Sequence, residues 1–153
     1  MNAPDRLPLN PLADPDGLQA FVNETWDREI VPLLSDYIAI PAKSPAFDPQ
    51  WVHNDHLETV VRNAAAWVES KKVAGLTLEV VRLADAAGRP RTPVIFFEVP
   101  ATKPGGNDAG ADTVLMYGHL DKQPEFSGWR SDLGPWTPKY EDGKLYGRGG
   151  ADD

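Results

Sequence analysis

A histidine and an aspartate, His119 and Asp121, stand two residues apart, directly after an apolar run at residues 113–117. Imidazole and carboxylate groups are ligands of hydrolytic metal ions. In an extended chain, residues i and i+2 project from the same face, so both side chains can point into one pocket. The imidazole can then bind a metal through one nitrogen while Asp121 accepts a hydrogen bond from the other. The spacing therefore predicts a metal ligand, His119, that Asp121 orients.

An aspartate pair, Asp152-Asp153, follows a glycine-rich turn later in the chain. Asp152 would bring a carboxylate that can bridge two cations. A less specific interpretation is that His119 and Asp121 belong to a capped turn with a satisfied surface histidine, since short motifs often match by chance. The residues around the motif favour the metal site over the capped turn.

Several parts of the sequence agree in order, spacing and residue type with one enzyme family. They are YGHLDKQP at 117–124, Trp129, GPWTP at 134–138 and DGKLYGRGGADD at 142–153. Together they resemble the M20 family of metallopeptidases, which includes carnosinase-like dipeptidases, carboxypeptidases that release glutamate, aminoacylases and the deacylases of arginine and lysine biosynthesis. The resemblance is dense over residues 113–153 and diffuse over residues 16–112.

The resemblance implies a role for each polar residue of the motif. His119 is similar to the ligand of one metal, and Asp121 to the residue that orients this ligand. Asp152 is similar to the carboxylate that bridges both metals. Asp153 stands next to it across a peptide bond that is cis in the family, and would shape the site.

The resemblance also implies the reaction. A two-metal hydrolase would activate water between two divalent cations about 3.5–4 Å apart and cleave the peptide bond of a dipeptide or short peptide. We expect zinc, with manganese or cobalt as alternatives, because histidine and carboxylate suit more than one of these metals. Gln123-Pro124 and the double aspartate favour the dipeptidase branch, whereas Lys122 stands where many members carry a small apolar residue. Removal of the acyl group of an N-acyl amino acid is the alternative within the class.

The family's general base and further metal ligands follow the double aspartate, whereas this sequence stops at Asp153. We expect residues 1–15, which contain four prolines, to form a mobile N-terminal arm, and the resemblance implies that residues 16–153 form the N-terminal part of the catalytic domain. The rest of that domain and the dimerisation or lid domain would be absent, and the full-length enzyme would be a homodimer. Residues 1–153 alone are expected to be inactive, and a non-catalytic fold fragment is the alternative from another class.

The composition excludes several other classes of protein. A chain of 153 residues suits one domain, and its 41% hydrophobic and 25% charged residues are typical of a globular protein. A net charge of −8 argues against nucleic acid or an anionic membrane as a partner, because both require a basic face. The sequence has no long apolar run and no cysteine, and its first 17 residues lack the apolar core of a secretory signal. We therefore expect a cytoplasmic protein, and the resemblance implies a small peptide or an N-acyl amino acid as its partner.

The expected fold class is α/β, a helix–sheet–helix catalytic domain of the zinc-peptidase type with a mixed sheet. A first helix is expected to begin near Asp16 and to be kinked at Pro32, or followed there by a second helix through Ile38. A later amphipathic helix is expected over residues 52–74, with Gly75 as its C-cap. The side chains expected to face inward are Phe21, Trp26 and Ile30 in the first helix and Leu57, Val60, Val61, Ala64, Trp67 and Val68 in the later one.

Strands are expected over residues 76–83, 92–99 and 113–117. The last of these carries His119 at its carboxyl end, where open α/β sheets bind their ligands. Asp142-Gly143, between two short stretches of strand type, predicts a tight hairpin.

Other patterns in the sequence have a simpler explanation than ligand binding. His53 and His56 stand three apart on the later helix and could hold a metal from one face, although a short pair of this kind is usually solvated. Trp129 and Trp136 fall inside the resembling segment, and we expect them to pack the loops of the site.

Glycines cluster just before the double aspartate, at Gly147, Gly149 and Gly150. They suggest a phosphate-binding loop, but the strand, G-X-G-X-X-G and helix that complete such a fingerprint are missing. We instead expect Gly149 and Gly150 to shape the site by letting the backbone pass close to the metals.

Overall fold

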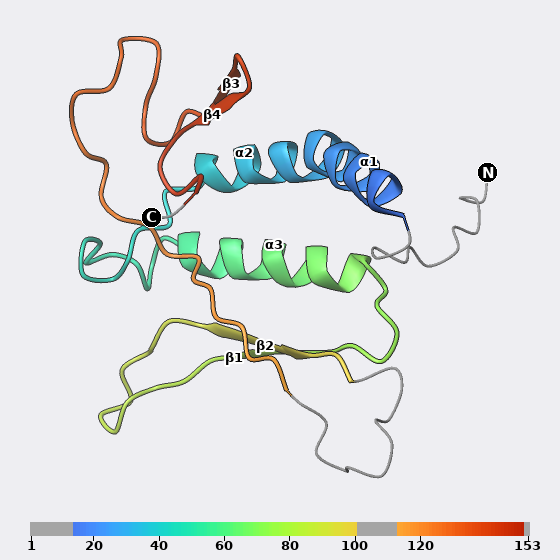
Figure 1. Cartoon of the computed structure of the whole chain (residues 1–153). Coiled ribbons are helices and arrows are strands. Elements are labelled where there is room, and N and C mark those ends of the chain that lie inside the picture. Colours follow the sequence, from blue (N-terminus) through green and yellow to red (C-terminus); the bar gives the residue numbers. More distant parts are fainter. Residues whose placement is uncertain (1–13, 101–112, 152–153) are drawn as a thin grey trace.

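The computed structural model describes residues 14–100 and 113–151, and both helices and strands are present, as the α/β class requires. Figure 1 shows α1, η1 and α2 in one row above α3, with the β1–β2 hairpin below α3 and the β3–β4 hairpin beyond α2. In chain order the elements are α1 (Pro15–Thr25), the π-helix η1 (Trp26–Ile30), α2 (Val31–Ala39), α3 (His56–Ser70), β1 (Thr77–Val81), β2 (Val94–Glu98), β3 (Lys139–Glu141) and β4 (Lys144–Tyr146).

The first helix begins one residue before the predicted start. Asp14 is its N-cap and accepts a hydrogen bond of 2.8 Å from the Gly17 N–H, and Pro15 occupies the first helical position. Both residue types are preferred there, because the cap satisfies a free N–H and proline has no N–H to lose. Asp14 and Pro15, which were predicted to belong to the arm, therefore belong to the start of α1, and residues 1–13 lie outside the described residues.

The predicted kink at Pro32 takes the form of a change in helix type. Pro32 is the second residue of α2, and the turn before it is the π-helix η1. Proline cannot donate a hydrogen bond to the carbonyl four residues earlier, and its ring clashes with that carbonyl in a regular α-helix. The π-turn, which occurs mostly as a single turn within α-helices, accommodates this disruption, and the helix continues through Ala39.

The prediction that Phe21 and Trp26 face inward is wrong for the described part of the chain, since they are 43% and 49% exposed. The core gathers instead around the end of α2, the loop after it and the first turns of α3. Ile38 and Ala42 are fully buried there. Periodicity identified an apolar face on α1 but could not identify what packs against it.

The helix predicted over residues 52–74 is shorter, because α3 covers only residues 56–70. Side-chain hydrogen bonds replace its first turn: the Asp48 carboxylate accepts from the Asn54 side-chain amide at 2.6 Å, and Asn54 Oδ1 accepts from the His56 N–H at 3.1 Å. Asp and Asn compete with the helix in this way. The predicted burial is confirmed for Leu57, Val60 and Val61, and the remaining buried residue is Ala65 rather than Ala64.

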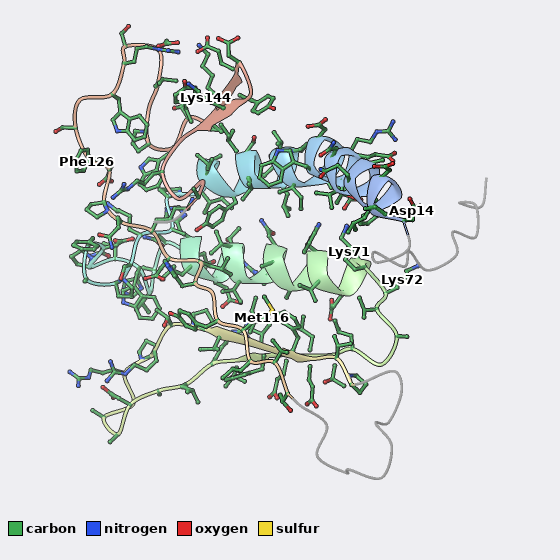
Figure 2. All side chains as sticks on the ribbon, viewed as in Figure 1. Asp14, Lys71, Lys72, Met116, Phe126 and Lys144 are labelled. Carbon is green, nitrogen blue, oxygen red and sulfur yellow. The ribbon has the colours of Figure 1, made fainter. Side chains whose placement is uncertain are left out.

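The end of α3 also differs from the prediction. Lys72, with φ +50°, adopts the left-handed conformation after the helix, whereas Gly75, with φ +77°, lies in the turn that leads into β1. Lys71 forms an ion pair with Glu29, which joins the end of α3 to η1. Asp14, at the start of α1, and Lys71 lie at the same end of the helical layer (Figure 2).

The strands form two separate antiparallel pairs in the described part of the chain, not the expected mixed sheet. β1 and β2 pair from Thr77–Glu98 to Val81–Val94, within the predicted strands, and α3 packs against both. The only parallel pairing among the described residues is the isolated bridge between Lys43 and Lys122.

Residues 113–117 do not form a strand, so this prediction is wrong. The side chains of Val114, Leu115, Met116 and Tyr117 are between 84% and 93% exposed. A strand needs a neighbour for its N–H and C=O groups, and among the described residues each sheet consists of one strand pair only. Composition indicates a preference for extended chain, whereas pairing depends on tertiary structure.

The predicted Asp-Gly hairpin is confirmed. β3 and β4 pair from Lys139–Tyr146 to Glu141–Lys144, and the two turn residues have φ +51° and +72°. Positive φ at both positions is the requirement of the type I′ turn, which matches the twist of the strands. Within the described residues, no helix is long and apolar enough to cross a membrane.

Candidate functional site

The segment that carries the candidate site residues is fixed by the loop after α2. The Lys122 N–H donates to the Ala42 carbonyl at 2.9 Å, and the Ser44 N–H donates to the Lys122 carbonyl at 2.9 Å. Two sequence regions almost eighty residues apart are thereby held side by side. This backbone pairing takes the place of the predicted strand in presenting His119 and Asp121.

His119 and Asp121 lie on one side of this segment, and Leu120 lies on the other. Leu120 packs against the core of Ala42, Leu57 and Val60. His119 Nδ1 is 3.1 Å from the Asp121 carbonyl oxygen and 3.3 Å from its carboxylate Oδ1. The alternation predicted from the sequence is therefore confirmed: the residue between the pair is anchored, and the pair faces away from the core.

The His119–Asp121 pair is accessible to a ligand. Its side chains are 35% and 36% exposed. With Nδ1 turned towards Asp121, Nε2 is the nitrogen with which His119 would bind a metal, and the carboxylate would fix this tautomer. The contact is compatible with the orienting role predicted for Asp121.

The predicted partner of this pair is Asp152. Asp152 and Asp153, with the peptide bond that joins them, lie outside the described residues. Within residues 14–100 and 113–151, no three histidine, aspartate or glutamate side chains gather closely enough to hold a metal ion. The bridging role of Asp152 and the site-shaping role of Asp153 therefore stay predictions.

The glycine-rich turn lies against two buried side chains from distant parts of the chain. A Cβ atom at Gly147 would overlap Ile38 Cγ2, and one at Gly149 would lie 3.0 Å from Cγ, Cδ and Cε of Lys122. Gly150 also borders Ile38, where a Cβ would be 3.3 Å from Cδ1. Close approach explains these glycines without a phosphate, whereas their predicted approach to metals stays a prediction.

Lys122 is the feature that the sequence interpretation missed. It is only 1% exposed, and its ammonium donates to the carbonyls of Tyr37 at 2.6 Å and Ile40 at 2.7 Å. Burial lowers the pKa of the Lys122 ammonium from its usual 10.5 to about 8. One sequence signal could have predicted this burial: Lys122 stands where many family members carry a small apolar residue, and a position that takes such residues is expected to be buried.

Beyond Lys122 the segment borders a shallow pocket of about 340 Å³, lined in part by Lys43, Glu125 and Trp136. The Lys43 ammonium donates to the Glu125 carboxylate at 2.8 Å, and this hydrogen bond holds the pKa of Glu125 below its usual range. The Trp129 indole N–H donates to the Glu125 carbonyl at 2.9 Å. This local hydrogen bond is compatible with the packing role predicted for Trp129, which stays a prediction.

His53 and His56 do not form the helical pair considered from the sequence. His56 is the first residue of α3, whereas His53 lies in the turn before it. The two therefore do not share one helix face, and His56 instead lines the shallow pocket described above.

Comparison with known proteins places this site in a family context. No family model matches the chain. It is 33% identical over 129 residues to the Beta-Ala-His dipeptidase of Homo sapiens, a match of 82% of the chain and 24% of that protein. It is 33% identical over 159 residues to the Cys-Gly metallodipeptidase of Candida albicans, a match of 97% of the chain and 28% of that protein.

A third relative is an uncharacterized metallohydrolase of Methanocaldococcus jannaschii, 33% identical over 129 residues, or 82% of the chain and 28% of that protein. The chain thus spans about a quarter of the length of these relatives. The matches extend far beyond the segment that carries the motif. With this similarity, and with the motif from His119 onwards, the chain belongs to the M20 family of metallopeptidases.

Proposed function

We propose that the whole protein is a metal-dependent hydrolase that cleaves the peptide bond of dipeptides or short peptides. The observation that carries the proposal is the contact between His119 Nδ1 and Asp121, at 3.1 and 3.3 Å, on an exposed side of a segment anchored in the core. Two relatives named as dipeptidases support the choice of substrate class. We expect two divalent cations, zinc or alternatively manganese or cobalt.

The donor set of this chain fits such a metal. His119 would bind it through Nε2, and Asp152 would bridge it to a second cation. A bound cation of this kind lowers the pKa of water and polarises a carbonyl oxygen. Asp121 would hold the imidazole in the tautomer and orientation that binding requires. Asp121 therefore does not need to touch the substrate to affect the rate.

The fold-level proposal follows from the same family. We propose that residues 16–153 belong to the N-terminal part of a zinc-peptidase-type catalytic domain, with the pair His119–Asp121 in its active site. We further propose that the whole protein is a homodimer and that residues 1–153 by themselves do not turn over substrate. The reason is that residues 1–153 offer two proposed metal ligands, His119 and Asp152, whereas catalytic zinc usually has three protein ligands.

A second candidate function is hydrolysis of N-acyl amino acids, which the same metal chemistry would permit. Lys122 is the residue that distinguishes this chain from many family members, but it is buried. Its side chain therefore does not contact a substrate and gives no reason to prefer the acyl substrate. The dipeptidase names of two relatives favour the peptide substrate.

The test uses the whole protein, dialysed against a chelator until its metal content is near zero. We expect loss of dipeptide hydrolysis and recovery with zinc, manganese or cobalt, with N-acetyl amino acids cleaved more slowly. His119→Ala should abolish both metal binding and turnover. His53 is an exposed histidine in the turn before α3, and the control His53→Ala should change neither. Full turnover by the metal-free protein would contradict the proposal.

A further inference from the structure

Lys122 places a cation at the C-terminal end of α2. Its Nζ donates to the carbonyls of Tyr37 at 2.6 Å, Ile40 at 2.7 Å and Ile38 at 3.4 Å. These carbonyls belong to the last turn of α2 and the residue that caps it. The last carbonyls of a helix have no partner within the helix and carry a partial negative charge, so a cation there is favourable. Among the described residues, the ammonium is therefore bound by the carbonyls at the end of α2 and not by a carboxylate.

Aromatic rings contribute to the same site. Nζ of Lys122 is 3.9 Å from the centroid of the Tyr37 ring and 5.4 Å from that of Trp136. The face of an aromatic ring attracts a cation, more strongly where water is excluded. With the residue only 1% exposed, the ammonium has one well-defined location. The role expected of Trp136, to pack the loops near the site, is consistent with this contact.

The stem of Lys122 supports the glycine-rich turn. Gly149 has φ +81°, and its missing Cβ would lie 3.0 Å from three carbons of the stem. Any other residue at position 149 would have to displace the lysine and also adopt a strained backbone. The lysine that follows His119 and Asp121 thus touches the glycine that precedes Asp152 by three residues.

We propose that Lys122 is a positioning residue for the proposed metal site, because it joins the segment that carries His119 and Asp121 to the end of α2 and to the turn at Gly149. The inference rests on the proposed metal-dependent function. The backbone of Lys122 holds this segment against Ala42 and Ser44, and its side chain packs against the turn at Gly149. Loss of the ammonium or of the glycine would shift the segment that carries His119 and Asp121 relative to the glycine-rich turn.

The first test compares Lys122→Met with Lys144→Met in the whole protein. Methionine keeps most of the stem but loses the charge. Lys144 is an exposed lysine on β4 (Figure 2) and serves as the matched control. We expect Lys122→Met to weaken the affinity for Zn²⁺ by roughly 10-fold or more, the scale found for groups that orient metal ligands. In steady-state kinetics kcat should fall while KM changes little, because Lys122 does not touch substrate. Titration calorimetry with the metal alone measures the affinity.

The second test is a double-mutant cycle that does not depend on activity. Gly149→Ala is compared with Gly88→Ala, because Gly88 has φ +76° but nothing within 4 Å of its missing Cβ. We expect Gly149→Ala to weaken Zn²⁺ binding and Gly88→Ala not to do so. In a Lys122→Ala background, which removes the stem, Gly149→Ala should weaken Zn²⁺ binding much less than it does in the wild-type background. Circular dichroism confirms that each variant is folded.

The outcomes separate the two proposals. If the wild-type protein binds no divalent metal, both the proposed function and this inference are wrong. If it binds metal and hydrolyses dipeptides, but Lys122→Met and Gly149→Ala bind Zn²⁺ as tightly as the wild type, only the positioning role is wrong. Independent, additive losses in the double-mutant cycle would also overturn it. If Lys122→Met does not fold, Gly149→Ala and its cycle still decide the question.

Discussion

The hydroxyl of Tyr37 donates a hydrogen bond of 3.1 Å to the carbonyl of Leu120, the residue between His119 and Asp121. This bond joins α2 directly to the centre of the candidate site. Leu120 also packs on the core beside Ala42, so its backbone and its side chain are both anchored. These two contacts of Leu120 therefore determine how His119 and Asp121 are oriented.

Leu120→Ala should lower the free energy of unfolding by about 2 kcal/mol, the lower end of the range for core leucines, because Leu120 is only partly buried. Leu115→Ala is the control, since Leu115 is 93% exposed and its change should stay within about 0.5 kcal/mol. Urea unfolding of both variants measures the difference. Equal effects would show that Leu120 is not an anchor.

Asp121→Asn should weaken metal affinity by roughly 10–100-fold, because an amide orients the His119 imidazole less strongly than a carboxylate does. Asp152→Ala should remove the proposed bridge and leave at most one metal per chain. Metal titration with measured stoichiometry separates these results, and Asp36→Asn, an exposed aspartate on α2, should have no effect. Equal and mild effects of the Asp121 and Asp152 variants would contradict the assignment.

The stability of the metal-free protein should rise with pH between about 8 and 10.5. The folded state holds the pKa of Lys122 at about 8 because of burial, against a usual value of 10.5. Between these two values the unfolded chain binds more protons than the folded chain, so raising the pH favours folding. The gain is at most about 1.4 kcal/mol per unit of pKa difference, and the carbonyls around Nζ reduce it.

The measurement for this prediction is the urea midpoint at pH 7 and pH 10, for the wild type and for Lys122→Met. The variant lacks the titrating group and should not gain the increment. The same pH response in both proteins would mean that another group is responsible.

Gly143→Ala should lower the free energy of unfolding by about 1 kcal/mol, because Gly143 has φ +72° in the tight turn of the β3–β4 hairpin. Asp142→Asn is the matched control. Asparagine tolerates the φ of +51° at that position and is favoured in this type of turn, so its effect should be small. Thermal unfolding followed by circular dichroism compares the two. An unchanged Gly143→Ala protein would mean that the hairpin contributes nothing to the folded state.

Features governed by short-range interactions could be predicted from the sequence. Asp142-Gly143 specifies its hairpin, because the two positive φ angles are a property of those two residues. The core-facing positions of α3 at Leu57 and Val60 follow from helical periodicity. His119 and Asp121 share one side because alternation in an extended chain requires it.

Contacts between distant residues required the tertiary structure. The unpaired state of residues 113–117 depends on which strands lie alongside, and the exposure of Phe21 depends on what packs against α1. Burial of Lys122 is the clearest case, since its partners Tyr37 and Ile40 precede it by more than eighty residues. A sequence pattern reports the conformational preferences of a segment of a few residues. The burial of the Lys122 ammonium instead depends on the carbonyls at the end of α2, which stabilise its charge and which only the folded chain brings next to it.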